Sequence, residues 1–152
     1  LVAWSDDINI GLTSIMLVCK HLTPLIAKKG GSIVNLSSDL SVISPDHRLY
    51  NKNKILGSKP ISYSVIKHGL IGLTKYLSTY LANKKIRVNS VSPGGIYKDQ
   101  PKQFVNKISK LIPLKRMATR NDMNSIIIYL LSYSSSYMTG SNLVIDGGRS
   151  VW

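Results

Sequence analysis

The sequence predicts an α/β fold, a parallel sheet with helices on its faces. Three β-rich segments, 32–36, 86–95 and 142–148, alternate with amphipathic segments along the 152 residues. Each β-rich segment ends in a turn-forming sequence, serine after the first and glycine pairs after the others, which is typical of short buried strands. No internal repeat or low-complexity linker interrupts the alternation, and helices that separate successive strands favour parallel pairing.

The helices are predicted from apolar residues that recur at helical spacing. The first spans 10–28 and ends at Gly30-Gly31, and the second spans 62–83 with a broad apolar side. A short amphipathic helix spans 101–112, and Asn121-Asp122 can cap a fourth through about Ser132. Between the first strand and the second helix, residues 39–60 are polar and contain two prolines, and connections of this length are usually functional or disordered.

The composition excludes several classes of protein. Twenty Lys+Arg oppose seven acids, all Asp, for a net charge of +13, which raises nucleic acid as a partner. The lysines are scattered, and no zinc spacing or RNA-binding signature accompanies them. A lysine-rich but functionally neutral surface is therefore favoured over nucleic-acid binding, and no metal site is expected. The lone Cys19 lies in an apolar run and is read as a buried side chain of a protein from a reducing compartment. No apolar stretch is long enough to predict a membrane span, and the segment LVAWSDD has no signal-peptide pattern, so we expect a cytoplasmic protein.

Candidate catalytic residues follow the first strand and open the second helix. Ser37 and Ser38 follow the strand 32–36, and ligands of parallel sheets bind beyond the carboxyl ends of strands. Tyr63 and Lys67 are four positions apart and therefore share one face of a helix. An ammonium beside a phenol favours the phenolate, so such a tyrosine can act as a general acid or base. Taken alone, this spacing is also common on solvated helices.

The order of these motifs resembles the second half of the short-chain dehydrogenase/reductase family. The matching segments are NLSS (35–38), YSVIKHGLIGLTKYL (63–77), IRVNSVSPGG (86–95) and GSNLVIDGG (140–148), and the resemblance as a whole extends over nearly the whole chain. The resemblance implies a partial Rossmann-like, doubly wound parallel sheet whose N-terminal βαβαβ half is absent from this sequence. It also implies that Ser38, Tyr63 and Lys67 are catalytic, with Ser38 orienting the substrate, Tyr63 moving the proton and Lys67 also binding the nicotinamide ribose of NAD or NADP.

Further site residues follow from the same resemblance. The segment PGG matches the turn beside the nicotinamide, which implies that Pro93, Gly94 and Ile96 contact the cofactor. The catalytic Tyr63 and Lys67 are implied to contact it as well. The usual threonine after this turn is replaced by Lys98, which we expect either to meet the cofactor phosphates or to point to solvent.

Two other positions depart from the family pattern. The asparagine that members carry in the helix before the serine strand is replaced by Gly11, so either the relay water is held differently or Asn9, two residues away, substitutes through a local shift. Ser38 and Tyr63 are 25 positions apart, wider than in most members, so residues 39–61 are interpreted as a substrate-loop insert. Within it, His47, Arg48 and Tyr50 are candidates for contact with a polar or anionic substrate, and a solvated loop is the alternative.

The insert and the closing DGGRSVW also resemble a subgroup found among bacterial surface-sugar and flagellin-modification genes, which implies a sugar-type substrate. No glycine-rich phosphate loop follows a strand into a helix in this sequence, so we expect the chain alone to bind NAD or NADP weakly or not at all. Two interpretations remain open: the catalytic half of an oxidoreductase, or a non-catalytic remnant that acts by association. In either, helices 10–28 and 62–83 are expected to form a homo-oligomer interface, as they do in the family.

Overall fold

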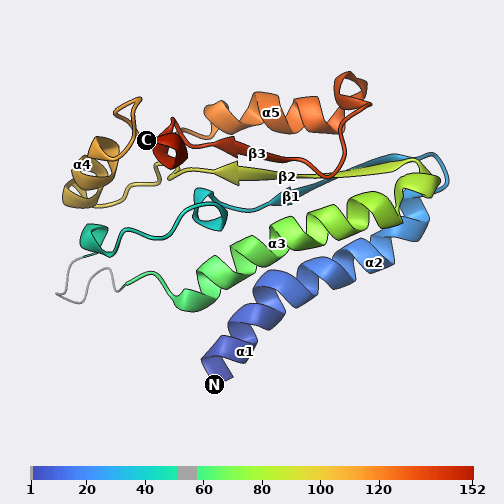
Figure 1. Ribbon diagram of the computed structural model, residues 1–152, viewed down its shortest axis with the longest axis horizontal. Coiled ribbons are helices and arrows are strands. Elements are labelled where there is room, and N and C mark those ends of the chain that lie inside the picture. The colour runs from blue at the N-terminus through green and yellow to red at the C-terminus, as the bar shows by residue number, and fades with distance from the viewer. Residues whose placement is uncertain (1, 51–57) are drawn as a thin grey trace.

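The fold is an α/β layered structure, seen here in a computed structural model that describes residues 2–50 and 58–152 (Figure 1). Three parallel strands, β1 (Gly31–Leu36), β2 (Ile86–Pro93) and β3 (Asn142–Ile145), pair in the order β1-β2-β3. Helix α3 (Ile61–Tyr80) covers one face of the sheet and α5 (Asn121–Leu131) covers the other. The predicted α/β class and the parallel pairing are confirmed.

The first helix is longer than the sequence predicted. Helix α1 (Val2–Ile8), a π-helical turn at Asn9–Thr13 and α2 (Ser14–Ile26) follow one another without a break, so the helix begins well before residue 10. The predicted helix rested on the apolar residues at helical spacing between Ile15 and Leu25, so the segment before residue 10 was not included. By length and composition alone, Val2–Ile26 is long and apolar enough to cross a membrane, contrary to the prediction, although helices of soluble proteins also pass this test.

Two glycines let the first helix and α3 approach closely. A Cβ on Gly11 would lie 2.8 Å from Cδ1 and 2.9 Å from Cγ2 of Ile66. A Cβ on Gly69 would lie 2.9 Å from Cδ2 of Leu12. Each helix therefore accepts a branched side chain of the other in a recess that only glycine provides.

Strand β2 carries polar side chains into the interior. Asn89, Ser90 and Ser92 have no exposed surface, and each has a hydrogen-bond partner. The hydroxyls of Ser90 and Ser92 donate to Oδ1 of Asn142 on β3, at 2.9 and 2.7 Å. These side chains pin the register of β2 against β3, because a buried polar group without a partner is costly.

Arg87, on β2, holds the end of α5 to the sheet. Its guanidinium donates to the carbonyls of Leu130 at 3.1 Å and Ser132 at 3.0 Å, and to Oγ of Ser135 at 2.9 Å. A cation at this position complements the partial negative charge of the helix C-terminus.

The beginning of α5 is capped differently from the prediction. Asn121 provides no side-chain cap. Instead Asp122 reaches back to accept from the backbone N–H of Thr119, and it forms an ion pair with Arg116 at 2.8 Å. The acidic residue of the predicted Asn-Asp pair therefore accepts a backbone N–H just before α5 begins.

Short helices and a small apolar cluster close the end of the molecule where the strands finish. Helix α4 (Lys102–Lys110) lies there together with the C-terminus (Figure 1). Ile108, Ile112 and Met117 enclose Leu49, so the polar segment after β1 is anchored against α4 by one buried leucine. This anchoring places the segment beside the carboxyl ends of the strands.

Candidate active site

A cavity of about 440 Å³ lies beyond the carboxyl ends of β1 and β2. This is the edge at which parallel α/β sheets bind ligands, and the volume is in the range of small-molecule sites. Residues from β1, the segment after it, α3, the turn after β2, α4 and the C-terminal segment line it: Leu36–Leu40, Tyr50, Lys59, Tyr63, Pro93–Ile96, Gln100, Phe104, Ile108, Met117 and Arg149.

Ser38 is buried in the wall of this cavity at the end of β1. Its side-chain oxygen caps the 3₁₀ turn Asp39–Ser41 by accepting from the backbone N–H of Leu40 at 3.2 Å. Its hydroxyl donates to Oδ1 of Asp39 at 3.0 Å. The serine is therefore fixed by two neighbours, and a substrate oxygen would compete with Asp39 for its proton.

Tyr63 and Lys67 lie on the first turns of α3, next to the end of β1. Tyr63 lines the cavity, and the ammonium of Lys67 lies 5.7 Å from the centre of its ring. Lys67 donates from Nζ to the carbonyl of Leu36 at 2.9 Å, and Oγ of Ser37 donates to the carbonyl of Lys67 at 2.7 Å. These two bonds tie the strand that carries the serine to the helix that carries the tyrosine.

A second lysine, which sequence reasoning missed, lies against the same tyrosine. Nζ of Lys59 is 3.9 Å from the centre of the Tyr63 ring, a cation–π contact. Burial lowers the pKa of Lys67, and the charge of Lys59 lowers it further. The pKa of Lys59 is also lowered by burial, while Asp39 opposes this shift. Positive charge is therefore concentrated around the phenol.

The turn after β2 forms another part of the wall. Pro93, Gly94 and Ile96, which the family resemblance implies contact the cofactor, line the cavity, whereas Lys98 is exposed and is not part of the lining. A Cβ on Gly94 would lie 2.8 Å from Cα of Asp146, so only glycine allows the turn to pack against the end of β3. The turn and Tyr63 thus line the same cavity.

The three candidates from the loop lie in different environments. Tyr50 lines the cavity and packs on Phe104 with ring centres 6.1 Å apart. Burial raises the pKa of Tyr50, which keeps its hydroxyl protonated. His47 is exposed, and the side chain of Arg48 is 87% exposed and paired with Asp46 at 2.8 Å, so neither belongs to the cavity wall. Part of the predicted insert, residues 51–57, lies outside the described residues.

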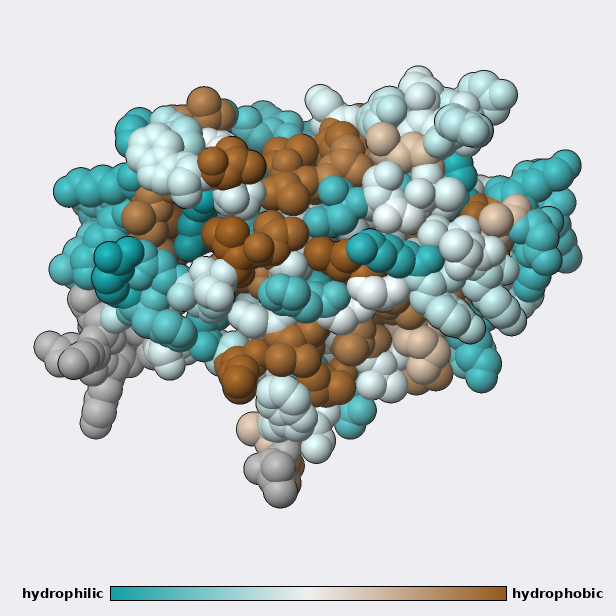
Figure 2. Space-filling model, viewed as in Figure 1, coloured by the Kyte–Doolittle hydropathy of each residue, from teal (hydrophilic) through white to brown (hydrophobic). Residues whose placement is uncertain are grey.

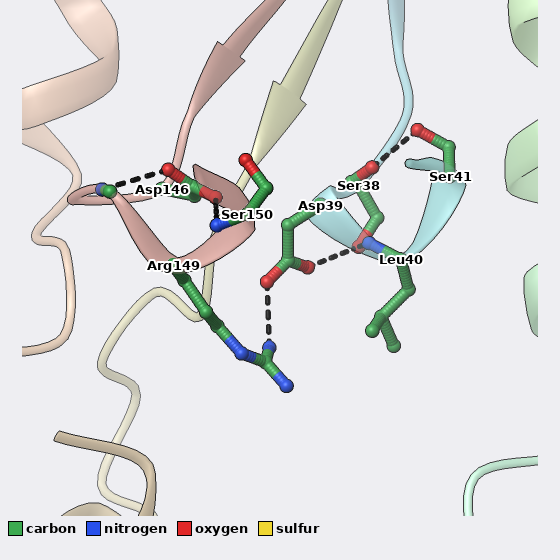
Figure 3. A network of polar contacts seen from close by, with 8 residues as sticks. Ser38, Asp39, Leu40, Ser41, Asp146, Arg149 and Ser150 are labelled. Atoms are coloured by element: carbon green, nitrogen blue, oxygen red, sulfur yellow. Dashed lines mark hydrogen bonds and ion pairs between the residues drawn. The ribbon is translucent and has the colours of Figure 1, made fainter. Parts of the chain in front are cut away.

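A buried ion pair that sequence reasoning also missed joins the serine turn to the C-terminal segment. Nη1 of Arg149 donates to Oδ2 of Asp39 at 2.7 Å, and the two side chains are only 7% and 4% exposed (Figure 3). The only sequence signal for this pair was a charged residue directly after each of two recognised motifs, NLSS and DGG.

In the described ranges 2–50 and 58–152, no group of three or more His, Cys, Asp or Glu side chains is arranged to hold a metal ion. The polar groups in the cavity wall include hydroxyl, phenol, ammonium and guanidinium groups.

Comparisons with known proteins agree with this geometry. The family model described as enoyl-(acyl carrier protein) reductase matches residues 2–150. The post-translational flagellin modification protein A of Campylobacter coli is 33% identical over 144 residues, which are 94% of this chain and 56% of that protein. The trans-4-hydroxycyclohexanecarboxylate dehydrogenase of Sinomonas cyclohexanicum is 35% identical over 147 residues, 97% of this chain and 52% of that protein.

Solved structures show the same likeness. A short chain dehydrogenase from Leptospira borgpetersenii with bound NAD+ superposes with a TM-score of 0.88 at 35% identity, over 97% of this chain and 56% of that one. The chain spans about half the length of the curated relatives it matches. The partial Rossmann-like sheet inferred from the sequence is confirmed, and the chain belongs to the short-chain dehydrogenase/reductase family.

Proposed function

We propose that the protein is an NAD(P)-dependent oxidoreductase that interconverts an alcohol and a carbonyl compound, and that this chain carries its catalytic half. The observation that supports this most strongly is the common cavity of Ser38 and Tyr63, with Lys67 beside the tyrosine and tied to the end of β1. Family membership and relatives with bound NAD+ support the same class of reaction.

The proposed chemistry uses each side chain for one task. In reduction, a hydride reaches the carbonyl carbon and the phenol of Tyr63 gives its proton to the carbonyl oxygen; in oxidation both transfers are reversed. Ser38 holds the substrate oxygen with its hydroxyl, after exchanging its bond to Asp39 for one to the substrate. Lys59 and Lys67 hold their ammonium groups 3.9 and 5.7 Å from the centre of the Tyr63 ring, so the proton transfer takes place beside two cationic side chains.

The residues present fit a nicotinamide ring. NAD or NADP, when bound, supplies or accepts the hydride. The turn formed by Pro93 and Gly94, together with Ile96, would support the ring next to Tyr63, and Lys67 would reach the ribose. Lys98, on the exposed side of the turn, remains a candidate for the cofactor phosphates.

The proposed substrate is a polyhydroxylated, sugar-type molecule. Support comes from the likeness to a flagellin modification protein and from the polar wall of the cavity, where Ser38, Asp39 and Gln100 can exchange hydrogen bonds with hydroxyls. His47 and Arg48 stay candidates for substrate contact from the loop outside the cavity wall.

We further propose that the protein is a cytoplasmic homo-oligomer. Helices α2 and α3 expose apolar side chains along the outer layer, among them Val18, Leu22 and Leu25 at 52%, 51% and 67%. Figure 2 shows apolar surface over these helices in the lower half of the view. A second copy that packs against this layer would bury it, which also accounts for the apolar length of Val2–Ile26 without a membrane.

This exposed layer is also the observation that favours the second candidate function, a non-catalytic chain that acts only through association. The two functions differ in the need for Tyr63. Under the catalytic proposal Tyr63→Phe removes the proton donor without disturbing packing, whereas under the alternative it changes nothing.

The experiment measures NADH and NADPH oxidation by the full-length protein with a panel of sugar-type ketones and aldehydes. We expect Tyr63→Phe to lower kcat by about 10²- to 10⁴-fold, the usual contribution of general acid–base catalysis. Tyr137→Phe, at an exposed position far from the cavity lining, is the matched control and should retain full turnover. Turnover of Tyr63→Phe within a factor of three of the parent protein would refute the proposed role.

A further inference from the structure

Arg149 is a buried arginine with unused donors on the wall of the cavity. Its side chain is 7% exposed, and Asp39 takes a bond from Nη1 alone. A guanidinium carries five N–H donors. Within the part of the chain that the structure describes, Nε and Nη2 have no hydrogen-bond partner, and Figure 3 shows Nη2 directed away from Asp39. Because Arg149 also lines the cavity, these donors are available to a bound molecule.

The position of Arg149 is set by a tightly built C-terminal turn. The carboxylate of Asp146 accepts from the backbone N–H groups of Gly148 at 2.9 Å and Ser150 at 2.7 Å. Gly147 and Gly148 both have positive φ, at 69° and 90°. The DGG sequence thus folds the chain back on itself, and Asp39 then fixes one edge of the guanidinium so that the other faces the cavity.

The charges of the cavity wall do not cancel. Among the described lining residues, Arg149 and Lys59 are cations and Asp39 is the one carboxylate. Asp39 forms a salt bridge with Arg149 at 2.7 Å, whereas among the described residues the ammonium of Lys59 forms no salt bridge and lies 3.9 Å from the centre of the Tyr63 ring. One positive charge of the described wall is therefore not compensated, so the guanidinium of Arg149 and the ammonium of Lys59 can bind one more negatively charged group.

The wall also carries large aromatic and aliphatic side chains. Tyr50, Phe104, Ile108 and Met117 line it, and all four belong to or pack against the cluster that anchors the loop. A ligand that suits the whole cavity thus combines an apolar face with one anionic group. A single carboxylate matches this charge, whereas a dianionic phosphate exceeds it.

We propose that Arg149, oriented by Asp39 and assisted by Lys59, binds a carboxylate of the substrate, so that the substrate class is a hydroxy acid or oxo acid, acidic sugars included. The assignment rests on the proposed function for the identity of the molecule as a substrate. The hydroxyl of Ser38 donates to the same Asp39 at 3.0 Å, so the anion site is separated from the reacting oxygen by one side chain. The carboxylate would therefore lie a few bonds from the carbon that reacts.

The experiment measures binding, not turnover. Isothermal titration calorimetry on the full-length protein, with and without NAD+, compares cyclohexanecarboxylate with its neutral amide, cyclohexanecarboxamide, which has the same shape. Hydrogen bonds to a charged group correspond to about tenfold to a hundredfold in affinity, so we expect the acid to bind that much more tightly than the amide. Inorganic phosphate should compete poorly.

Variants locate the effect. Arg149→Met should remove most of the preference for the acid, and the double variant Arg149→Met with Asp39→Asn should do the same without leaving a buried carboxylate unpaired. Arg120→Met removes an exposed positive charge outside the cavity lining and should leave the preference intact.

Equal affinities for acid and amide, no binding of either, or an unchanged preference in the double variant would overturn the assignment. The outcome is separable from the proposed function: carboxylate preference that depends on Arg149 in a protein without NAD(P)-linked turnover would refute the proposed reaction and leave the anion site standing.

Discussion

The close contact between Gly11 and Ile66 allows a quantitative test of how the first helix is seated on α3. In a helix, replacing glycine by alanine normally stabilises the protein by about 0.5–1 kcal/mol because the unfolded chain loses freedom. At Gly72, in the middle of α3, an added Cβ meets nothing within 4 Å, so Gly72→Ala should show this gain. At Gly11 the same methyl would lie 2.8 Å from one carbon and 2.9 Å from another of a β-branched, buried side chain.

The expected cost at Gly11 follows from overpacking. Inserting a methyl into a filled site costs about 1–3 kcal/mol, since Ile66 is stiff at χ1 and cannot rotate away freely. Gly11→Ala should therefore be less stable than Gly72→Ala by about 1–3 kcal/mol. Ile66→Ala alone should cost about 2–5 kcal/mol. Together with Gly11→Ala it should cost less than the sum, because the new methyl occupies part of the vacated space.

The assay is urea unfolding of the full-length protein followed by circular dichroism, with all four combinations at positions 11 and 66 and with Gly72→Ala as the control. A coupling energy of about 1–3 kcal/mol is expected from the double-mutant cycle. If the changes at 11 and 66 add within about 0.5 kcal/mol, or if Gly11→Ala is as stabilising as Gly72→Ala, the contact described between the helices is not the one the protein makes.

Two other predictions concern Arg87 and Lys59. Arg87→Met should destabilise the protein by about 2–4 kcal/mol in urea unfolding. This is at the low end for several charge-assisted bonds, because the carbonyls of Leu130 and Ser132 each keep another donor. Arg87→Lys should recover part of the loss, and a cost below about 1 kcal/mol for the methionine variant would contradict the proposed role. Lys59→Met should raise the pKa of Lys67, because it removes the like charge that lowers it, so Lys67 should stay charged to higher pH. Competitive acetylation of Lys67 across pH 7–11 measures this, and an unchanged or lower titration midpoint would contradict it.

The sequence predicted those features that depend on local pattern. Strands appear as short β-rich runs between turn residues, and the rule that ligands bind beyond the carboxyl ends of strands places Ser38 at the binding edge. The family resemblance groups Ser38 with Tyr63, and both side chains line one cavity. Lys67 followed from helical spacing to Tyr63. Such features need no knowledge of what packs against them.

Features that depend on distant residues were not predictable in this way. Asp39 and Arg149 meet although they are 110 positions apart, and nothing in either neighbourhood specifies the other. Gly11 was recognised as a departure from the family pattern, but its reason became visible only when Ile66 was found in the space that a larger side chain would need. Leu49, one apolar residue in a polar stretch, gave no periodic signal and yet anchors the loop.

The hydroxyl and amide groups that join β2 to β3 have a consequence for local opening. If the two strands separate, side-chain hydrogen bonds of Ser90, Ser92 and Asn142 break together with the backbone hydrogen bonds. Partial separation of the strands is therefore energetically unfavourable. Amide protons of β2 should consequently exchange with solvent by the largest opening events available to the domain. The turn at Pro93 and Gly94 is the direct continuation of this strand, so this part of the cavity wall should keep its position when a molecule enters.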